Sequence, residues 1–169
     1  MNKLVGLGGV SRAGKTTLAN ALCTSSSNIT LIELDRFTLP APQMPRINGR
    51  YDWEHPHSVD WPGVMAEIES ENIPGQLILI EGILAFTNPR LNARYDGGLF
   101  MNLNHREYLV SRRQEKRWGA EPSWYLDYVW DAHLVYGRPD PPLANWVELP
   151  PISQGDPITT ASEFLQSIH

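Results

Sequence analysis

Residues 3–23 constrain what this chain can fold into more than any other part of the sequence. A short apolar run ends in a glycine-rich bend, and a segment rich in alanine and leucine follows at once. The bend, residues 9–16, fits the phosphate-binding loop pattern Gly-x-x-x-x-Gly-Lys-Thr with no mismatch. A chance glycine-rich turn is a poor alternative, because four fixed residues occur together between a predicted strand and a predicted helix. The stretch therefore predicts a binding site for a nucleoside triphosphate.

Each fixed position of this bend has a chemical reason. Gly9 and Gly14 lack a Cβ, so the backbone can turn back on itself and point consecutive N–H groups at one anion. Lys15 adds a mobile positive charge for the β- and γ-phosphates, and the Thr16 hydroxyl can ligate Mg²⁺. The positive end of the following helix faces the same oxygens. The other residues expected to line the phosphates are Ser11, Arg12, Ala13 and Thr17.

The composition is that of one globular domain over residues 1–169, with 41% apolar and 20% charged residues. A net charge of −5 argues against nucleic acid or an anionic membrane as a partner. Cys23 is the single cysteine, which favours a reducing compartment, and no apolar run is long enough to span a bilayer. We expect a cytoplasmic protein that is a monomer or a homodimer.

Apolar runs alternate with helical patterns, which predicts an α/β fold with a parallel five-stranded sheet flanked by helices in three layers. Strands are predicted at 3–7, 29–33, 77–80, 98–103 and 146–149. Helices are predicted at 15–23, 61–70, 104–117, 122–136 and 160–168. Residues 36–57 are expected to be irregular, because prolines and a glycine interrupt them, and long loops of this kind commonly carry function.

Two carboxylates follow predicted strands. Asp35 comes after the second strand, and Glu81 ends the third. Because ligands bind at the carboxyl ends of parallel strands, both are expected to face the phosphate loop. Glu81 is placed to hold Mg²⁺, and Asp35 to accept the proton of an acceptor hydroxyl. The alternative for Asp35, a carboxylate that caps the loop after its strand, becomes the weaker one beside a phosphate loop.

The predicted helix at 104–117 is rich in arginine. A solvated basic face explains most of these residues, but a lid that closes over a triphosphate also needs arginine to clamp charge. One or two of Arg112, Arg113 and Arg117 are expected to do so, in a lid at about 112–124. The guanine-reading motif Asn-Lys-x-Asp of GTPases is absent, and Asp60–Gly63 does not follow an apolar strand as a switch motif would. A small-molecule kinase is the best prediction from these residues.

Five segments, in order, resemble those of the nicotinamide riboside kinase and uridine kinase family. They are GVSRAGKTTLANAL, LIELDRFTLP, RYDWEHPHSVD, LILIEGILAF and SRRQEKRW followed by WYLDYVW, so that the resemblance spans roughly residues 3–168. It favours the nicotinamide riboside kinase branch, because of Tyr51-Asp52 and the segment at 125–130. The family has the P-loop kinase fold, uses Mg-ATP and phosphorylates the 5′-hydroxyl of a ribonucleoside.

The resemblance also implies roles for single residues. Asp35 would be the general base, with Lys15 at the phosphates, and Thr16 and Glu81 would serve the metal. Asp52 would bind the ribose hydroxyls together with an arginine of the Arg112/Arg113 pair. Tyr51 would stack on the base, opposite Trp118, and Phe37 would line the acceptor site. A stack of aromatic rings suits a flat cationic base such as nicotinamide; simple packing under a long loop is the alternative for Tyr51 and Trp118.

Two departures keep other functions open. The family often has an aromatic-Lys-Pro after its catalytic Asp, whereas this chain has Thr38-Leu39-Pro40, and the spacing between the fourth strand and the arginine pair also differs. Uridine or cytidine is therefore an alternative acceptor. A kinase of a sugar, a pantothenate-like acid or a glycerate is a second alternative, and a nucleotide-binding regulatory protein without turnover is a third.

Overall fold

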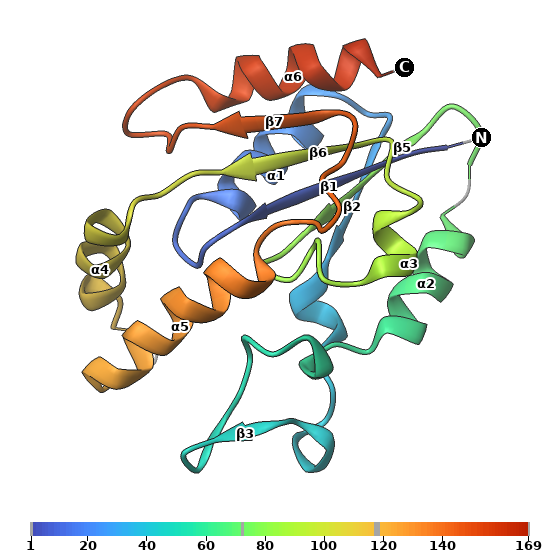
Figure 1. Ribbon diagram of the computed structural model, residues 1–169. Helices are drawn as coiled ribbons and strands as arrows, with labels where there is room; N and C mark the ends of the chain where they lie inside the picture. The colour runs from blue at the N-terminus through green and yellow to red at the C-terminus, as the bar shows by residue number, and fades with distance from the viewer. Residues whose placement is uncertain (1, 72, 117–118, 169) are drawn as a thin grey trace.

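A parallel sheet forms the centre of the computed structural model, which describes residues 2–71, 73–116 and 119–168 (Figure 1). The five strands lie in the order β2-β5-β1-β6-β7. Their bounds are β1 (Lys3–Gly9), β2 (Ile29–Glu33), β5 (Leu77–Glu81), β6 (Gly97–Met101) and β7 (Trp146–Leu149). All four pairings within this sheet are parallel, so the carboxyl ends of the strands share one edge. The predicted fold class is confirmed.

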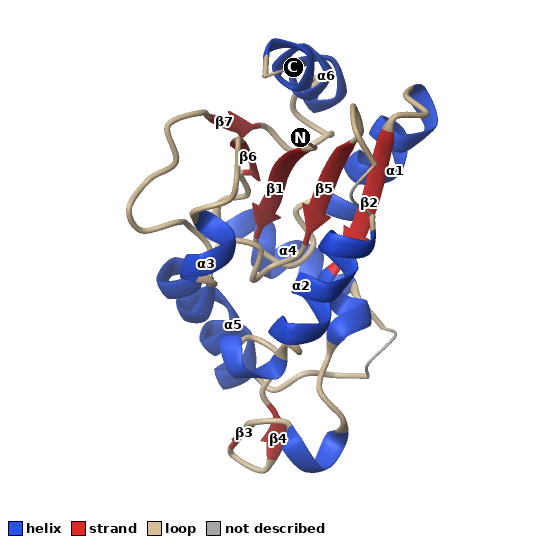
Figure 2. Ribbon diagram, turned by 90° about the vertical axis from the view of Figure 1, so that its right-hand side faces the viewer, coloured by secondary structure: helices blue, strands red, loops and turns tan. Residues whose placement is uncertain are grey.

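Helices cover both faces of the sheet and make the three layers (Figures 1 and 2). One core cluster joins alternate strand residues such as Val5, Leu7 and Leu79 to α1 (Lys15–Ser25) and α6 (Pro157–Ser167). The other joins the opposite strand positions to α2 (Trp61–Ser70) and α3 (Pro89–Asn92). Strand β5 is buried along its whole length, as an uninterrupted apolar run requires. Among the described residues, no helix is long and apolar enough to cross a membrane.

The remaining elements gather at the carboxyl edge of the sheet. Helix α4 (His105–Gln114) follows β6, and Asn104 and Glu107 form a capping box at its N-terminus. Helix α5 (Ser123–Tyr136) packs against α4. The small antiparallel hairpin of β3 (Arg46–Ile47) and β4 (Arg50–Tyr51) projects away from the sheet (Figure 2).

Several predicted boundaries are wrong for local reasons. The last helix begins at Pro157, because Asp156 rather than Thr160 accepts the capping hydrogen bond, from the N–H of Thr159. Residues 36–57 are not wholly irregular, since they hold the hairpin and the short 3₁₀ turns Leu34–Phe37, Ala41–Gln43 and Pro56–Ser58. Trp124 on α5 is 38% exposed rather than packed in the core.

Candidate active site

The phosphate loop leaves β1 at Gly9 and enters α1 after Gly14, and both glycines have positive φ (139° and 98°). A Cβ on Gly9 would lie 2.6 Å from the carbonyl oxygen of Met101, on the neighbouring strand β6. Position 9 therefore requires glycine for two reasons: its backbone has positive φ, and there is no room for a Cβ. Of the other predicted loop residues, Ala13 is buried and Thr17 is exposed.

Replacing Gly9 by Ala is expected to raise KM for ATP at least about tenfold, because a strained backbone here, costing roughly 1–3 kcal/mol, displaces the N–H groups that face the phosphates. The matched control is Gly75→Ala. Gly75 also has positive φ (83°), but a Cβ there would meet nothing within 4 Å, and it precedes β5. Steady-state kinetics on both variants tests the expectation, which an equal effect on KM in the two would contradict.

Lys15 lies buried at the start of α1, where its ammonium Nζ donates to the carbonyl oxygen of Val10 at 3.1 Å. Burial lowers the pKa of Lys15, and the charges of Glu81, Asp35 and Glu54 partly offset this. The lysine is thus held inside the loop with three carboxylates in its surroundings. Such a desolvated cation gains by pairing with an incoming anion.

The hydroxyl of Thr16 donates to Glu81 Oε2 at 3.2 Å. Glu81 ends β5 opposite Leu7 of β1 and Glu33 of β2, so sheet register places this carboxylate beside the loop. Burial raises the pKa of Glu81, and Lys15 counteracts this. A hydroxyl and a carboxylate side by side are the oxygen donors that Mg²⁺ accepts, usually with water and phosphate completing its shell. The described residues contain no cluster of three or more His, Cys, Asp or Glu side chains that could hold a metal ion by themselves.

Asp35 follows β2 in the 3₁₀ turn Leu34–Phe37 and is exposed. Its carboxylate is close enough to Lys15 and Glu81 to influence the pKa of each, so the predicted neighbourhood of strand-end carboxylates exists. Phe37, one turn further, is half-buried and packs against the core cluster on the α2 side, where its backbone carbonyl accepts from Asp60 N–H. The structure gives Phe37 a packing role.

The hairpin and the residues after it form the acceptor loop, residues 46–54. The guanidinium of Arg46 lies 4.4 Å from the centre of the Tyr51 ring, and Trp53 meets that ring edge-on at 6.3 Å. Asp52 is buried, and its Oδ2 accepts a hydrogen bond from the Tyr128 hydroxyl of α5 at 2.6 Å. Asp52 is therefore held in place by a residue of α5 that is distant in sequence.

The arginines predicted for the lid have different surroundings. Arg112 is buried; it donates to both carboxylate oxygens of Glu121 (2.7 and 2.9 Å) and to the Ser11 hydroxyl at 2.6 Å. It thus ties α4 to the phosphate loop. Arg113 is exposed. The predictions on Arg117 and Trp118 fall outside the described residues.

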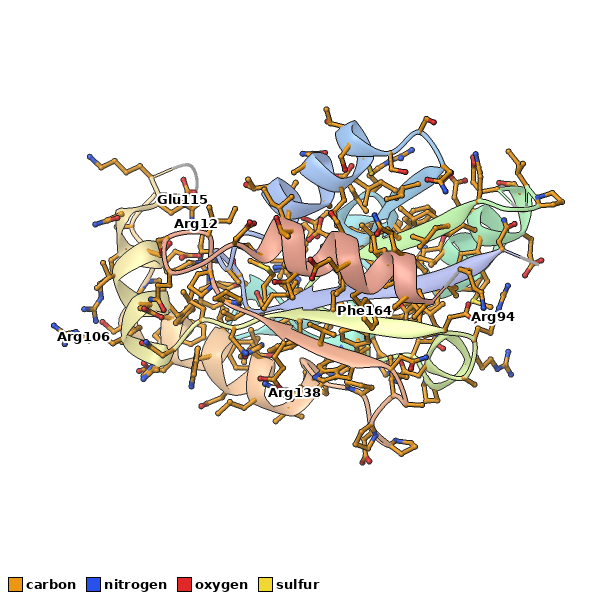
Figure 3. All side chains as sticks on the ribbon, turned by 90° about the horizontal axis from the view of Figure 1, so that it is seen from above. Arg12, Arg94, Arg106, Glu115, Arg138 and Phe164 are labelled. Atoms are coloured by element: carbon orange, nitrogen blue, oxygen red, sulfur yellow. The ribbon has the colours of Figure 1, made fainter. Side chains whose placement is uncertain are left out.

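A second tie joins the loop to the end of α4. Arg12, a non-glycine residue with positive φ (72°), donates to Glu115 at 2.8 Å, and Figure 3 shows the two side chains directed toward each other. A cavity of 620 Å³ opens beside this tie, lined by the phosphate loop, by α4 through Val110, and by residues 151–153. Residues 151–153 were not predicted for the site. The prolines after the last strand were a signal for an ordered loop there, but only the fold brings it to the phosphate loop.

Comparison with known proteins supports the fold. No protein-family model matches the chain. Nicotinamide riboside kinase 2 of Mus musculus is 25% identical over 158 residues, which cover 82% of this chain and 81% of that protein. A sugar kinase structure from Janibacter superposes with a TM-score of 0.67 at 17% identity, covering 98% of this chain and 95% of that one. A possible uridine kinase from Bacillus stearothermophilus gives 0.54 at 14% identity, covering 86% and 88%.

The chain has the P-loop kinase fold. The resemblance to nicotinamide riboside kinases found in the sequence is confirmed, with 25% of the aligned residues identical. The sequence similarity to kinases also confirms the prediction of a small-molecule kinase. These comparisons do not identify the acceptor of this P-loop kinase. Proteins of the same fold are named for different substrates, such as a sugar and uridine.

Proposed function

We propose that this P-loop kinase transfers the γ-phosphoryl group of ATP to the 5′-hydroxyl of a ribonucleoside, with nicotinamide riboside as the leading acceptor. One observation carries the proposal. Lys15 of the phosphate loop shares its surroundings with Asp35, Glu54 and Glu81, so an acceptor bound on the loop of Tyr51 and Asp52 would reach the phosphates. The sequence similarity to nicotinamide riboside kinase supports the choice of acceptor.

In this proposal the residues divide the work of phosphoryl transfer. Lys15 and the loop N–H groups hold the phosphates, and Asp35 accepts the proton of the attacking hydroxyl. Asp52 accepts hydrogen bonds from ribose hydroxyls, which its fixed hydrogen bond with Tyr128 prepares it to do. Thr16 and Glu81 would hold Mg²⁺, which supplies neutralisation of the phosphate charge when bound. The adenine ring of ATP would enter the 620 Å³ cavity beside Val110.

The decisive experiment incubates the protein with Mg-ATP and a panel of acceptors, and measures ADP formation. The panel contains nicotinamide riboside, uridine, cytidine, a hexose, gluconate, pantothenate and glycerate. Turnover with kcat/KM for nicotinamide riboside at least about tenfold above every other acceptor is expected. Preference for a sugar or an acid would contradict the proposal, and no turnover with any acceptor would favour a regulatory protein.

A kinase of an anionic acceptor is the second candidate, because two exposed arginines, Arg46 and Arg50, flank Tyr51 in the hairpin. Arg46 already lies over the Tyr51 ring, and Arg50 over the ring of Tyr125 at 4.8 Å. These cations would favour a carboxylate-bearing acceptor and disfavour a cationic base. The two candidates therefore differ in what they require of Tyr51.

Replacing Tyr51 by Ala separates the candidates. If a nucleoside base stacks on this ring, the acceptor KM should rise roughly 10- to 100-fold, since base stacking on an aromatic side chain is worth about 1–3 kcal/mol. A sugar acid should instead depend on the arginines, so Arg46→Ala would raise its KM while Tyr51→Ala would not. Tyr136→Ala, a tyrosine at the end of α5, serves as control for loss of a ring. Acceptor kinetics on the three variants provide the measurement.

A further inference from the structure

Arg112 and Glu121 form a buried ion pair beside the phosphate loop, and the proposed mechanism gives this pair no role. The two side chains are 7% and 8% exposed. Glu121 lies two residues before α5 begins, so the pair joins the end of α4 to the start of α5. Removing two charges from water is costly, and an apolar pair of similar size often supports a fold equally well. The pair therefore needs a functional explanation as well as a structural one.

The geometry of this pair fixes the direction of the guanidinium. Glu121 accepts hydrogen bonds from Nε at 2.7 Å and from Nη2 at 2.9 Å, one at each carboxylate oxygen. A bidentate pair of this kind is planar, and it leaves the third nitrogen, Nη1, on the side away from the carboxylate. Nη1 donates to the Ser11 hydroxyl at 2.6 Å. Glu121 thus determines that Arg112 points at the phosphate loop.

A second tie shows that attachment of the loop to α4 does not itself require an arginine at position 112. Arg12, next to Ser11, donates to Glu115 at 2.8 Å (Figure 3). The Arg12 side chain is 36% exposed, so this tie is made nearer the surface. An uncharged donor could also bond the Ser11 hydroxyl. What the buried arginine adds is a positive charge at the loop.

That charge lies in the neighbourhood of the phosphate lysine. Burial raises the pKa of Glu54 to about 7, and the charges of Arg112 and Lys15 oppose this, so both cations are within electrostatic reach of one carboxyl group. Burial also lowers the pKa of Arg112, but the hydrogen bonds and the charge of Glu121 outweigh this and raise it. The guanidinium therefore stays charged beside the loop, where a transferring phosphoryl group needs cations.

We propose that Glu121 is a positioning residue for phosphoryl transfer, which holds the Arg112 guanidinium so that its charge stabilises the transferring phosphoryl group at the loop. Glu121 acts through Arg112 and not by contact with ATP or the acceptor. A donor that is fixed in advance is effective because it needs no reorganisation during the reaction. The inference rests on the proposed transfer from ATP, but it requires no particular acceptor.

The kinetic test uses the acceptor that the wild-type protein uses best. In Glu121→Gln, kcat is expected to fall at least about tenfold, because a neutral amide no longer holds both nitrogens of the guanidinium. KM for ATP and for the acceptor should stay within about threefold of wild type, the pattern of an interaction made in the transition state. Glu121→Asp keeps the charge and should recover part of the lost kcat. Arg112→Lys keeps a charge but loses the fork, so its kcat should be as low as that of Glu121→Gln.

A stability measurement separates positioning from packing. Glu121→Gln leaves a buried guanidinium without its carboxylate, so the unfolding temperature is expected to fall by about 6–20 °C. The double variant Arg112→Met/Glu121→Leu removes both charges and should unfold within about 5 °C of wild type, because apolar residues can replace a buried ion pair. Its kcat should nonetheless remain at least about tenfold below wild type. Kinetics are measured at a temperature at which the unfolding curves show every variant folded.

The matched control removes a glutamate from another arginine. Arg94 lies 2.8 Å from Glu69 of α2 in an exposed pair. In Figure 3, Arg94 lies at the opposite end of the molecule from Arg12 and Glu115. Glu69→Gln should leave kcat and both KM values within about twofold of wild type, since exposed pairs contribute little.

The outcomes separate this inference from the proposed function. A double variant that recovers both stability and turnover would overturn the inference, since the pair would then only support the fold. Unchanged kcat in Glu121→Gln, or full turnover in Arg112→Lys, would also overturn it and leave the proposed function standing. Glu121→Asp and Arg112→Lys keep both charges of the pair, so they provide the test if the double variant does not fold. No turnover of the wild-type protein with any acceptor would overturn both.

Discussion

Asp35→Asn is expected to lower kcat by about 10²–10⁴-fold, the usual contribution of a positioned general base. The amide keeps the shape of the side chain but cannot accept the proton of the attacking hydroxyl. Asp35 is exposed in the turn after β2, so the substitution removes no buried interaction and the fold should be unaffected. KM for ATP should stay within about twofold of wild type, because Asp35 is assigned to the acceptor hydroxyl rather than to the phosphates.

The measurement is steady-state kinetics with the preferred acceptor, together with a thermal unfolding curve. Asp127→Asn is the matched control, since Asp127 is an exposed aspartate on α5 without an assigned role. Full turnover in Asp35→Asn would show that another group takes the proton. Glu54 and Glu81 would then be the carboxylates to replace next, because both lie in the surroundings of Lys15.

Lys15→Ala is expected to reduce kcat by at least about 10²–10³-fold, comparable to the loss of one preorganised donor to developing charge. The ammonium is buried at the start of α1, and within the described part of the chain it donates only to the carbonyl oxygen of Val10. Burial lowers the pKa of Lys15, which means that its charge is held in an unfavourable environment until an anion arrives. Removing it should therefore cost little stability while it abolishes useful turnover.

Lys3→Ala is the control, because Lys3 begins the same strand, β1, at the opposite end from the loop. Its ion pair with Asp96 at 3.2 Å is partly exposed, and losing it should cost less than about 1 kcal/mol. ADP release and ATP-binding calorimetry on both variants separate chemistry from binding. Lys15→Ala with a wild-type rate would refute the assignment of residues 9–16 as the phosphate site.

Much of the fold was predictable, because local patterns had one physical solution. The apolar run at 77–80 could only be buried on both faces, and it is the fully buried strand β5. The helix predicted from residue 104 exists, and Asn104 and Glu107, three positions apart, form a capping box at its start. The errors occurred where one residue competes with another for the same role. At α6, Asp156 and Pro157 supply a cap and a first turn before Thr160 can, so the helix begins earlier.

The residues of the candidate site were also predictable from the sequence only in part. Lys15, Thr16 and Glu81 could be brought together from sequence, because register in a parallel sheet sets which strand ends are neighbours. Tyr128 and Glu54 could not. The contact of Tyr128 with Asp52 joins residues 76 positions apart. The charges that act on Glu54 include Lys15 of α1 and Arg112 of α4, which are also distant in sequence.

The sequence by itself determined that this protein carries a phosphate-binding loop between a strand and a helix of a parallel α/β fold. The reason is that a phosphate loop, the strand before it and the helix after it are contiguous in the chain, and short-range geometry follows from residue order. Only the tertiary structure decided how the acceptor side is built. It placed Arg112 on Glu121 and Ser11, and it buried Glu54 beside Asp52. Burial and pairing depend on which distant segments meet, and no local pattern of residues records that.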